Sequence, residues 1–191
     1  RLIREIVEGI RAEFPSLEVG VHLSITDPPR LPGVETIDPT VDRPAHRFGM
    51  SRQYPDRADL LEPFGLIAFL QVLGVRLFNI SVGSPHTSPQ LYAPGRPDRS
   101  GKTGERTHPL VFVQRNLEST RACKQRFPDL IIMGGGYSWL RAYLPHVAAM
   151  EIDDGHADFV GLGRMSRTYG DLPRDVLQGG IVDGTRLMPH P

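Results

Sequence analysis

The feature that most constrains the fold is a regular alternation of helix-like and strand-like segments. Apolar residues at helical spacing predict helices, and short apolar runs bounded by Gly and Pro predict strands. The predicted helices cover residues 1–14, 60–73, 109–126, 138–147 and 172–177. The predicted strands cover residues 19–23, 77–82, 130–133 and 159–162. Such alternation is typical of an α/β protein with a parallel sheet.

Four strand–helix units correspond to about half of a (β/α)8 TIM barrel, which typically has about 250 residues. We therefore predict a partial barrel over residues 1–179 and an irregular tail over residues 180–191. The chain begins at Arg1 inside a helical pattern, so we expect a further N-terminal part. Two long Pro- and Gly-rich stretches, 25–57 and 83–107, follow strands. They are expected on the C-terminal face of the sheet, where such barrels bind their ligands.

Composition narrows the class of protein. Lys plus Arg and Asp plus Glu both number 22, and this zero net charge argues against a nucleic-acid partner. No apolar run reaches the roughly 18 residues of a membrane span, and no signal peptide is recognisable. We therefore expect a soluble cytoplasmic protein that acts on a small molecule. The single cysteine, Cys123, excludes an intramolecular disulfide, and the histidines lack metal-binding spacing, so we predict no metal site.

Two glycine-rich corners follow the last two predicted strands. The first is Gly134–Gly136, and the second is the Gly-Leu-Gly-Arg run over residues 161–164. Glycine lets the backbone approach an anion closely, and free N–H groups at a helix start can bind its oxygens. In (β/α)8 barrels a frequent phosphate site lies after strands seven and eight. Spacing alone fits a phosphate site and plain tight turns equally well.

Five segments in order carry a resemblance to a known family; they are residues 1–11, 19–27, 74–83, 133–138 and 158–173. They are similar to the C-terminal half of the old yellow enzyme family of FMN-dependent NADH:flavin oxidoreductases and enoate reductases, from the helix before strand five to strand eight. The resemblance implies that FMN is the cofactor and that NAD(P)H is the electron donor. It also implies hydride transfer through the flavin to an activated alkene or a similar acceptor.

The resemblance further implies which residues hold the cofactor. In the family, backbone N–H groups at the two corners bind the FMN phosphate. Here these would belong to Gly135, Gly136, Gly163 and Arg164, with Gly134 nearby. The Arg164 side chain would add a positive charge close to the phosphate dianion.

The chain departs from the family at His22, where the fifth strand usually carries an arginine that reaches the flavin pyrimidine edge. Histidine is shorter and lacks the rigid guanidinium fork. Two interpretations stay open: His22 supports the flavin weakly, or it is an inward-facing histidine with a local hydrogen bond. His86 and Tyr92 lie in the loop that borders the family's substrate pocket, and there they are either chemical groups or ordinary loop residues.

The family's substrate-gripping histidine pair and proton-donating tyrosine belong to its first half, so we assign no catalytic residue here. Two alternatives to an oxidoreductase fragment remain. One is a non-catalytic phosphate- or nucleotide-binding half-barrel, and the other is an inactive truncation. A half-barrel has open strand edges, and a homo-oligomer is one way to cover them.

Overall fold

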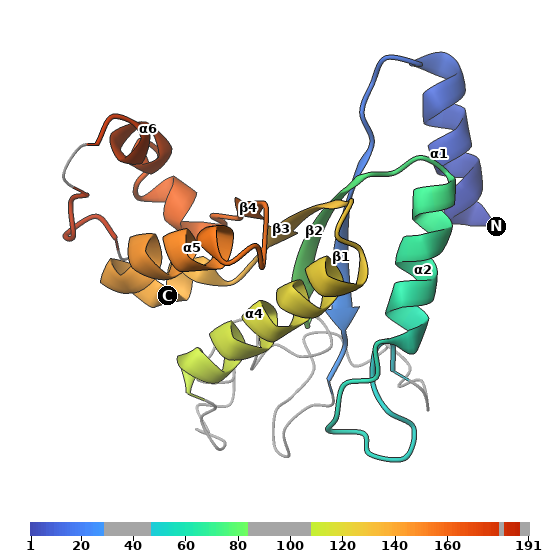
Figure 1. Cartoon of the computed structure of the whole chain (residues 1–191), viewed down its shortest axis with the longest axis horizontal. Coiled ribbons are helices and arrows are strands. Elements are labelled where there is room, and N and C mark those ends of the chain that lie inside the picture. The colour runs from blue at the N-terminus through green and yellow to red at the C-terminus, as the bar shows by residue number, and fades with distance from the viewer. Residues whose placement is uncertain (29–46, 84–107, 180–181, 188–191) are drawn as a thin grey trace, which may run out of the picture.

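A computed structural model describes residues 1–28, 47–83, 108–179 and 182–187 (Figure 1). Its α-helices are α1 (Leu2–Glu13), α2 (Leu61–Val72), α4 (Pro109–Arg126), α5 (Leu144–Asp153) and α6 (Leu172–Leu177). Two short 3-10 helices are η1 (Tyr137–Tyr143) and η2 (Arg164–Arg167). The strands are β1 (Gly20–Thr26), β2 (Leu77–Val82), β3 (Ile131–Gly134) and β4 (Phe159–Val160). His86 and Tyr92 lie outside the described residues.

The four strands form one parallel sheet in the order β1-β2-β3-β4. Helices separate the strands along the chain, and the predicted α/β class with a parallel sheet is confirmed. Sequential neighbours pair because a crossover helix returns the chain to the adjacent edge in the same direction. The carboxyl ends of all four strands therefore lie at one edge of the sheet.

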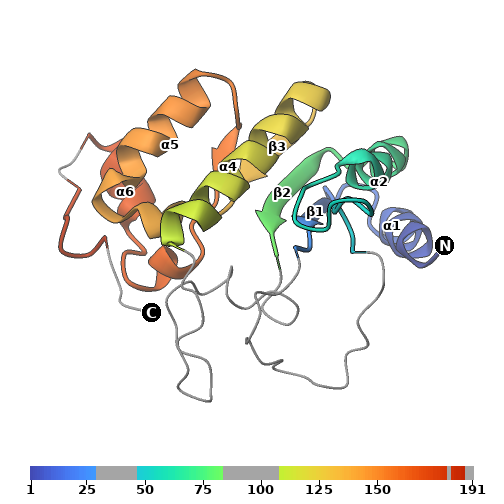
Figure 2. The same ribbon diagram turned by 90° about the horizontal axis from the view of Figure 1, so that it is seen from below.

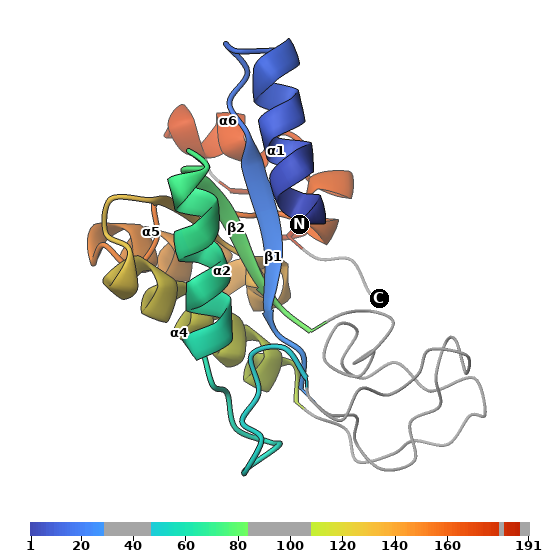
Figure 3. The ribbon, with the colours of Figure 1, turned by 90° about the vertical axis from the view of Figure 1, so that its right-hand side faces the viewer.

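One face of the sheet carries the main core. Its apolar residues alternate along each strand, as in Val21 and Leu23 of β1 or Phe78 and Ile80 of β2. Helices α1, α2 and α4 supply the residues that pack against this face, among them Val7. Figure 3 shows α1 and α2 in front of β1 and β2, and Figure 2 shows α4 between α2 and α5. The helices thus follow one another around the sheet in chain order.

The opposite face of the sheet remains accessible to solvent. Its apolar residues Leu77, Ile131 and Phe159 are 36%, 39% and 54% exposed. The polar side chains of His22 and Asn79 lie in the register row of Phe159, one row beyond that of Leu77 and Ile131 on the same face. All-parallel sheets are normally covered on both faces, so a solvent-accessible face is unusual for such a sheet.

A second core lies beyond the sheet, between the C-terminal helices. It contains buried residues of α4, η1, α5 and α6, including Val113, Tyr137, Leu144 and Leu172. Leu187 is also buried in it, so the turn formed by residues 182–187 packs on the folded body although it has no regular structure.

The region after β3 differs from the prediction. Serine is a preferred helix N-cap, but Ser138 caps no helix here, because Gly136 precedes η1 and no side chain caps that helix. The helix predicted over residues 138–147 is broken at Arg141, where φ is 53°. A proline in the first turn of α5 favours a helix start there, since its missing N–H needs no intrahelical acceptor at that position. Tyr143, the last residue of η1, is 72% exposed.

Candidate functional site

The two glycine corners are adjacent in the folded chain. Gly134 and Val160 are register partners at the carboxyl ends of β3 and β4. The Gly161 N–H continues this pairing and donates to the Gly134 carbonyl oxygen at 2.8 Å. A second link joins the following turns, because the Met165 N–H donates to Ser138 Oγ at 3.4 Å. Gly134, Gly135, Gly136, Gly163 and Arg164 are therefore gathered at one edge of the sheet.

The first corner holds its glycines for two different reasons. The Gly135 N–H donates to the Ile80 carbonyl oxygen at 3.1 Å, and a Cβ at Gly135 would lie 3.1 Å from that oxygen. Gly136 has a φ of +88°, and its Cβ would lie 3.1 Å from the Asn116 side chain. The predicted role of Gly135 as a phosphate donor needs correction, because its N–H already belongs to the hydrogen-bond ladder with β2.

The second corner is more open. Gly163 is exposed, and a Cβ there would meet no atom within 4 Å. It immediately precedes η2, which begins at Arg164. Within the described ranges, the N–H groups of Gly136 and Gly163 donate to no protein acceptor. These two N–H groups can therefore bind an external anion without breaking an internal hydrogen bond.

His22 lies apart from the corners, on the accessible face of the sheet. It is level with Asn79 on β2 and Met133 on β3. Neighbouring strands are about 4.8 Å apart, which places His22 about 10 Å across the sheet from Met133. His22 Nε2 lies 3.0 Å from Ser81 Oγ, a local hydrogen bond of the kind that one of the two interpretations expects.

A buried ion pair joins α4 to α5, and sequence reasoning missed it. The Glu151 side chain is fully buried on α5, and its carboxylate accepts two hydrogen bonds from Arg121 of α4. His156 Nδ1 lies 3.5 Å from Glu151 Oε2. Burial, reinforced by the Glu151 charge, raises the pKa of the neighbouring Tyr137 phenol above its usual range. Arg121 and Glu151 are 30 positions apart, so no local pattern links them.

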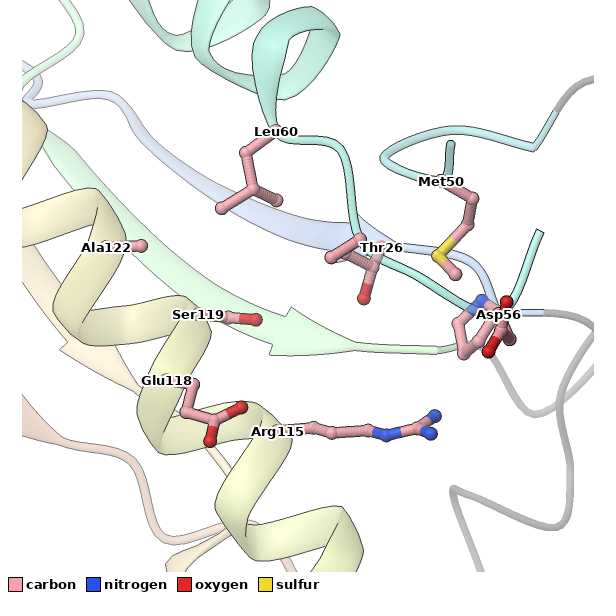
Figure 4. A pocket seen from close by; sticks show the side chains of 10 residues that line it. Thr26, Met50, Asp56, Leu60, Arg115, Glu118, Ser119 and Ala122 are labelled. Carbon is pink, nitrogen blue, oxygen red and sulfur yellow. The ribbon is translucent and has the colours of Figure 1, made fainter. Parts of the chain in front are cut away.

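A pocket of about 380 Å³ lies on the other side of α4, between the end of β1, the segment before α2 and α4 (Figure 4). Thr26, Met50, Leu60, Arg115 and Ser119 are among its lining residues. None of the sequence-predicted site residues lines it. No local sequence pattern predicts it, because three separate segments contribute to its walls.

Other chemistry is limited in the part of the chain that the structure describes. No group of three His, Cys, Asp or Glu side chains there could hold a metal ion. None of the described helices is both long and apolar enough to cross a membrane.

Cys123 is buried, and this burial raises its pKa to about 12, so the thiol stays protonated at neutral pH. It is therefore unsuited to nucleophilic chemistry.

The chain matches no protein-family model, no curated protein and no solved structure. The residues and the geometry of the two corners are therefore the basis for assigning a function.

Proposed function

We propose that this chain is the C-terminal half of an FMN-dependent oxidoreductase built on a (β/α)8 barrel. In this proposal β1 to β4 are the fifth to eighth barrel strands. The observation that carries the proposal is the adjacency of the two glycine corners, joined by the 2.8 Å hydrogen bond from Gly161 to Gly134. A phosphate site after the last two strands is a recurrent feature of such barrels.

The residues at the corners fit a phosphate group. The N–H groups of Gly136 and Gly163 have no acceptor among the described residues, and Gly163 stands in open space. The Arg164 N–H belongs to the same helix start. Gly134 and Gly135 contribute indirectly. A Cβ at either position would lie 3.1 Å from neighbouring atoms, so the absence of a side chain allows the close backbone packing of this turn. Two corners donating to one anion would hold it more firmly than either alone.

The accessible sheet face supports a barrel interior. Its register rows are apolar at the amino ends of the strands, where Leu77 pairs with Ile131. They become polar toward the carboxyl ends, where Ser24 pairs with Ser81. A barrel needs packed apolar layers below and polar groups at the C-terminal mouth, where its active site lies. We propose that the remaining barrel strands cover this face in the complete protein.

His22 would then lie beside the flavin ring system. The flavin supplies hydride transfer from NAD(P)H to an activated alkene or a similar acceptor, while the protein binds and orients it. His22 Nε2 is shared with Ser81, so His22 can present a positive charge or a single N–H but not the paired donors of an arginine. The groups that grip the substrate belong to the other half of the barrel in this proposal.

The test is bound flavin per chain, measured by absorbance after expression with and without the upstream coding region. Two matched variants sharpen it: Gly163→Glu adds a carboxylate at the corner, and Gly9→Glu adds the same charge on exposed helix α1. Both glycines have open space around them, so both variants should fold. We expect Gly163→Glu to lose at least tenfold in FMN affinity and Gly9→Glu to bind normally.

Three outcomes would contradict the proposal. A complete protein without flavin colour would contradict the oxidoreductase. Binding of inorganic phosphate at the corners without flavin would instead favour a non-catalytic phosphate- or nucleotide-binding half-barrel. Equal FMN affinity in the Gly163→Glu and Gly9→Glu variants would remove the corners from the site.

A further inference from the structure

The pocket behind the sheet offers a second, independent binding site. It lies on the helix side of the sheet, between Thr26 at the end of β1, Leu60 before α2, and Ser119 on α4 (Figure 4). Its volume of about 380 Å³ falls within the range of small-molecule sites. It shares no lining residue with the glycine corners, which follow β3 and β4, or with His22, which lies on the opposite face of the sheet.

Two buried residues present free hydroxyl groups to this pocket. Thr26 is only 5% exposed and Ser119 only 9% exposed, and both side chains point into the space drawn in Figure 4. Within the described residues neither hydroxyl makes a hydrogen bond, whereas the adjacent Thr120 hydroxyl donates to the Asn116 carbonyl oxygen at 2.8 Å. Neither oxygen is among the fully buried side-chain atoms that lack a partner, so both are accessible from the pocket and can donate to or accept from a ligand.

A guanidinium group completes the polar side of the pocket. Arg115 extends from α4 along the pocket, and no carboxylate of the described chain lies within ion-pair distance of it. The nearby Glu118 carboxylate accepts from Gln114 Nε2 at 2.8 Å instead. By contrast, Arg121 on the same helix is paired with Glu151. Arg115 is therefore available to a ligand, and its planar fork suits a carboxylate.

The other lining residues indicate the polarity and the charge of the ligand that this pocket can bind. Met50 is buried and Leu60 half-buried, and with Ala122 they give the pocket an apolar side. The carboxylates of Asp56 and Glu118 also line it. Two negative charges against one guanidinium repel a dianion such as a phosphate ester more strongly than a monoanion, so a monoanion bound at Arg115 is the anion that this lining disfavours least.

We propose that this pocket binds a small organic monocarboxylate with a short apolar chain. Its carboxylate accepts hydrogen bonds from Arg115, Thr26 and Ser119, and its chain packs against Met50 and Leu60. The proposal is independent of the flavin, since it uses none of the residues at the glycine corners.

The test uses the full 191-residue chain and sodium hexanoate as the probe. Binding is followed by amide chemical-shift changes and by the shift in melting temperature, with hexanol and inorganic phosphate as comparison ligands. We expect hexanoate to perturb the amides of Thr26, Met50 and Ser119, and to bind at least tenfold more tightly than hexanol or phosphate.

Three variants locate the site. Arg115→Gln should weaken hexanoate binding at least tenfold, and Ala122→Leu should abolish it by filling the apolar side. Arg76→Gln removes the same charge from an exposed position outside the pocket and should leave binding unchanged. Absence of hexanoate binding, equal binding of hexanol, tighter binding of phosphate, or equal losses in the Arg115 and Arg76 variants would overturn the proposal.

Discussion

The Gly161 N–H donates to the Gly134 carbonyl oxygen at 2.8 Å, and this bond joins two turns that are separated by a whole helix in the sequence. It extends the short pairing of β3 with β4 by one step beyond Val160. Both turns are thereby held at the same edge of the sheet. The proposed anion site depends on this relationship, because neither turn alone supplies enough free N–H groups.

The left-handed backbone of Gly136 makes it the most restrictive glycine of the first corner. Gly136→Ala should destabilise the protein by about 2 kcal/mol, because a side chain at positive φ is strained and would press on Asn116. Gly9→Ala is the control, since it lies in α1 with open space and should stabilise by about 0.5–1 kcal/mol. Urea unfolding measures both changes. Equal stability of the two variants would contradict the strain assigned to Gly136.

Loss of Arg121 should destabilise the folded protein, because its partner Glu151 is fully buried. Arg121→Met leaves the fully buried Glu151 carboxylate without its cation and should cost about 3 kcal/mol. The Arg174→Met control breaks an exposed pair with Asp171 and should cost less than about 1 kcal/mol. Thermal and urea unfolding both measure the loss. A similar small effect in both variants would mean that water replaces the lost cation at Glu151.

Cys123 should make stability depend on pH in the alkaline range. Burial raises its pKa from 9.0 to about 12, so the folded protein holds this proton more tightly than the unfolded chain. The contribution is fully present below pH 9 and is lost as the pH rises toward 12, at up to about 1.4 kcal/mol per pH unit. Unfolding of the wild type and Cys123→Ala between pH 9 and 11 measures this slope. The variant should show a shallower decline, and identical slopes would contradict the assignment.

Under the proposed function, the position of His22 leads to a prediction for the complete protein loaded with flavin. His22→Arg should raise the flavin midpoint potential by about 30 mV, or about 1.4 kcal/mol for a two-electron couple, because a permanent charge stabilises anionic reduced flavin. His146→Arg on the exposed face of α5 is the charge control and should leave the potential unchanged. An unchanged potential in His22→Arg would place His22 away from the flavin and leave its bond to Ser81 as its role.

Much of the fold could be predicted from local signals. The helix over residues 109–126 and the short helix over residues 172–177 agree with α4 and α6 at both ends. Proline at a helix start and a left-handed glycine after a helix end are local in their effect, and Gly74 after α2 has a φ of +83° as its terminating role requires. The prediction was wrong after Ser138, where the backbone turns at Arg141 before α5 begins.

The site could be predicted only in part. Glycine spacing identified the residues of both corners, because a strand followed by glycines and a helix is a local pattern. It could not reveal that the Gly135 N–H is already bonded to Ile80, since that acceptor belongs to another strand. The pocket beside Arg115 gave no signal at all, because its walls come from distant segments.

The sequence by itself determined the order of the elements, the parallel α/β class and the positions of the tight turns, because periodicity and backbone freedom act over a few residues. Only the tertiary structure decided which N–H groups remain free, that Glu151 is buried against Arg121, and that Thr26 and Ser119 face one cavity. These properties arise from contacts between segments far apart in the chain. Packing, and not local preference, sets them.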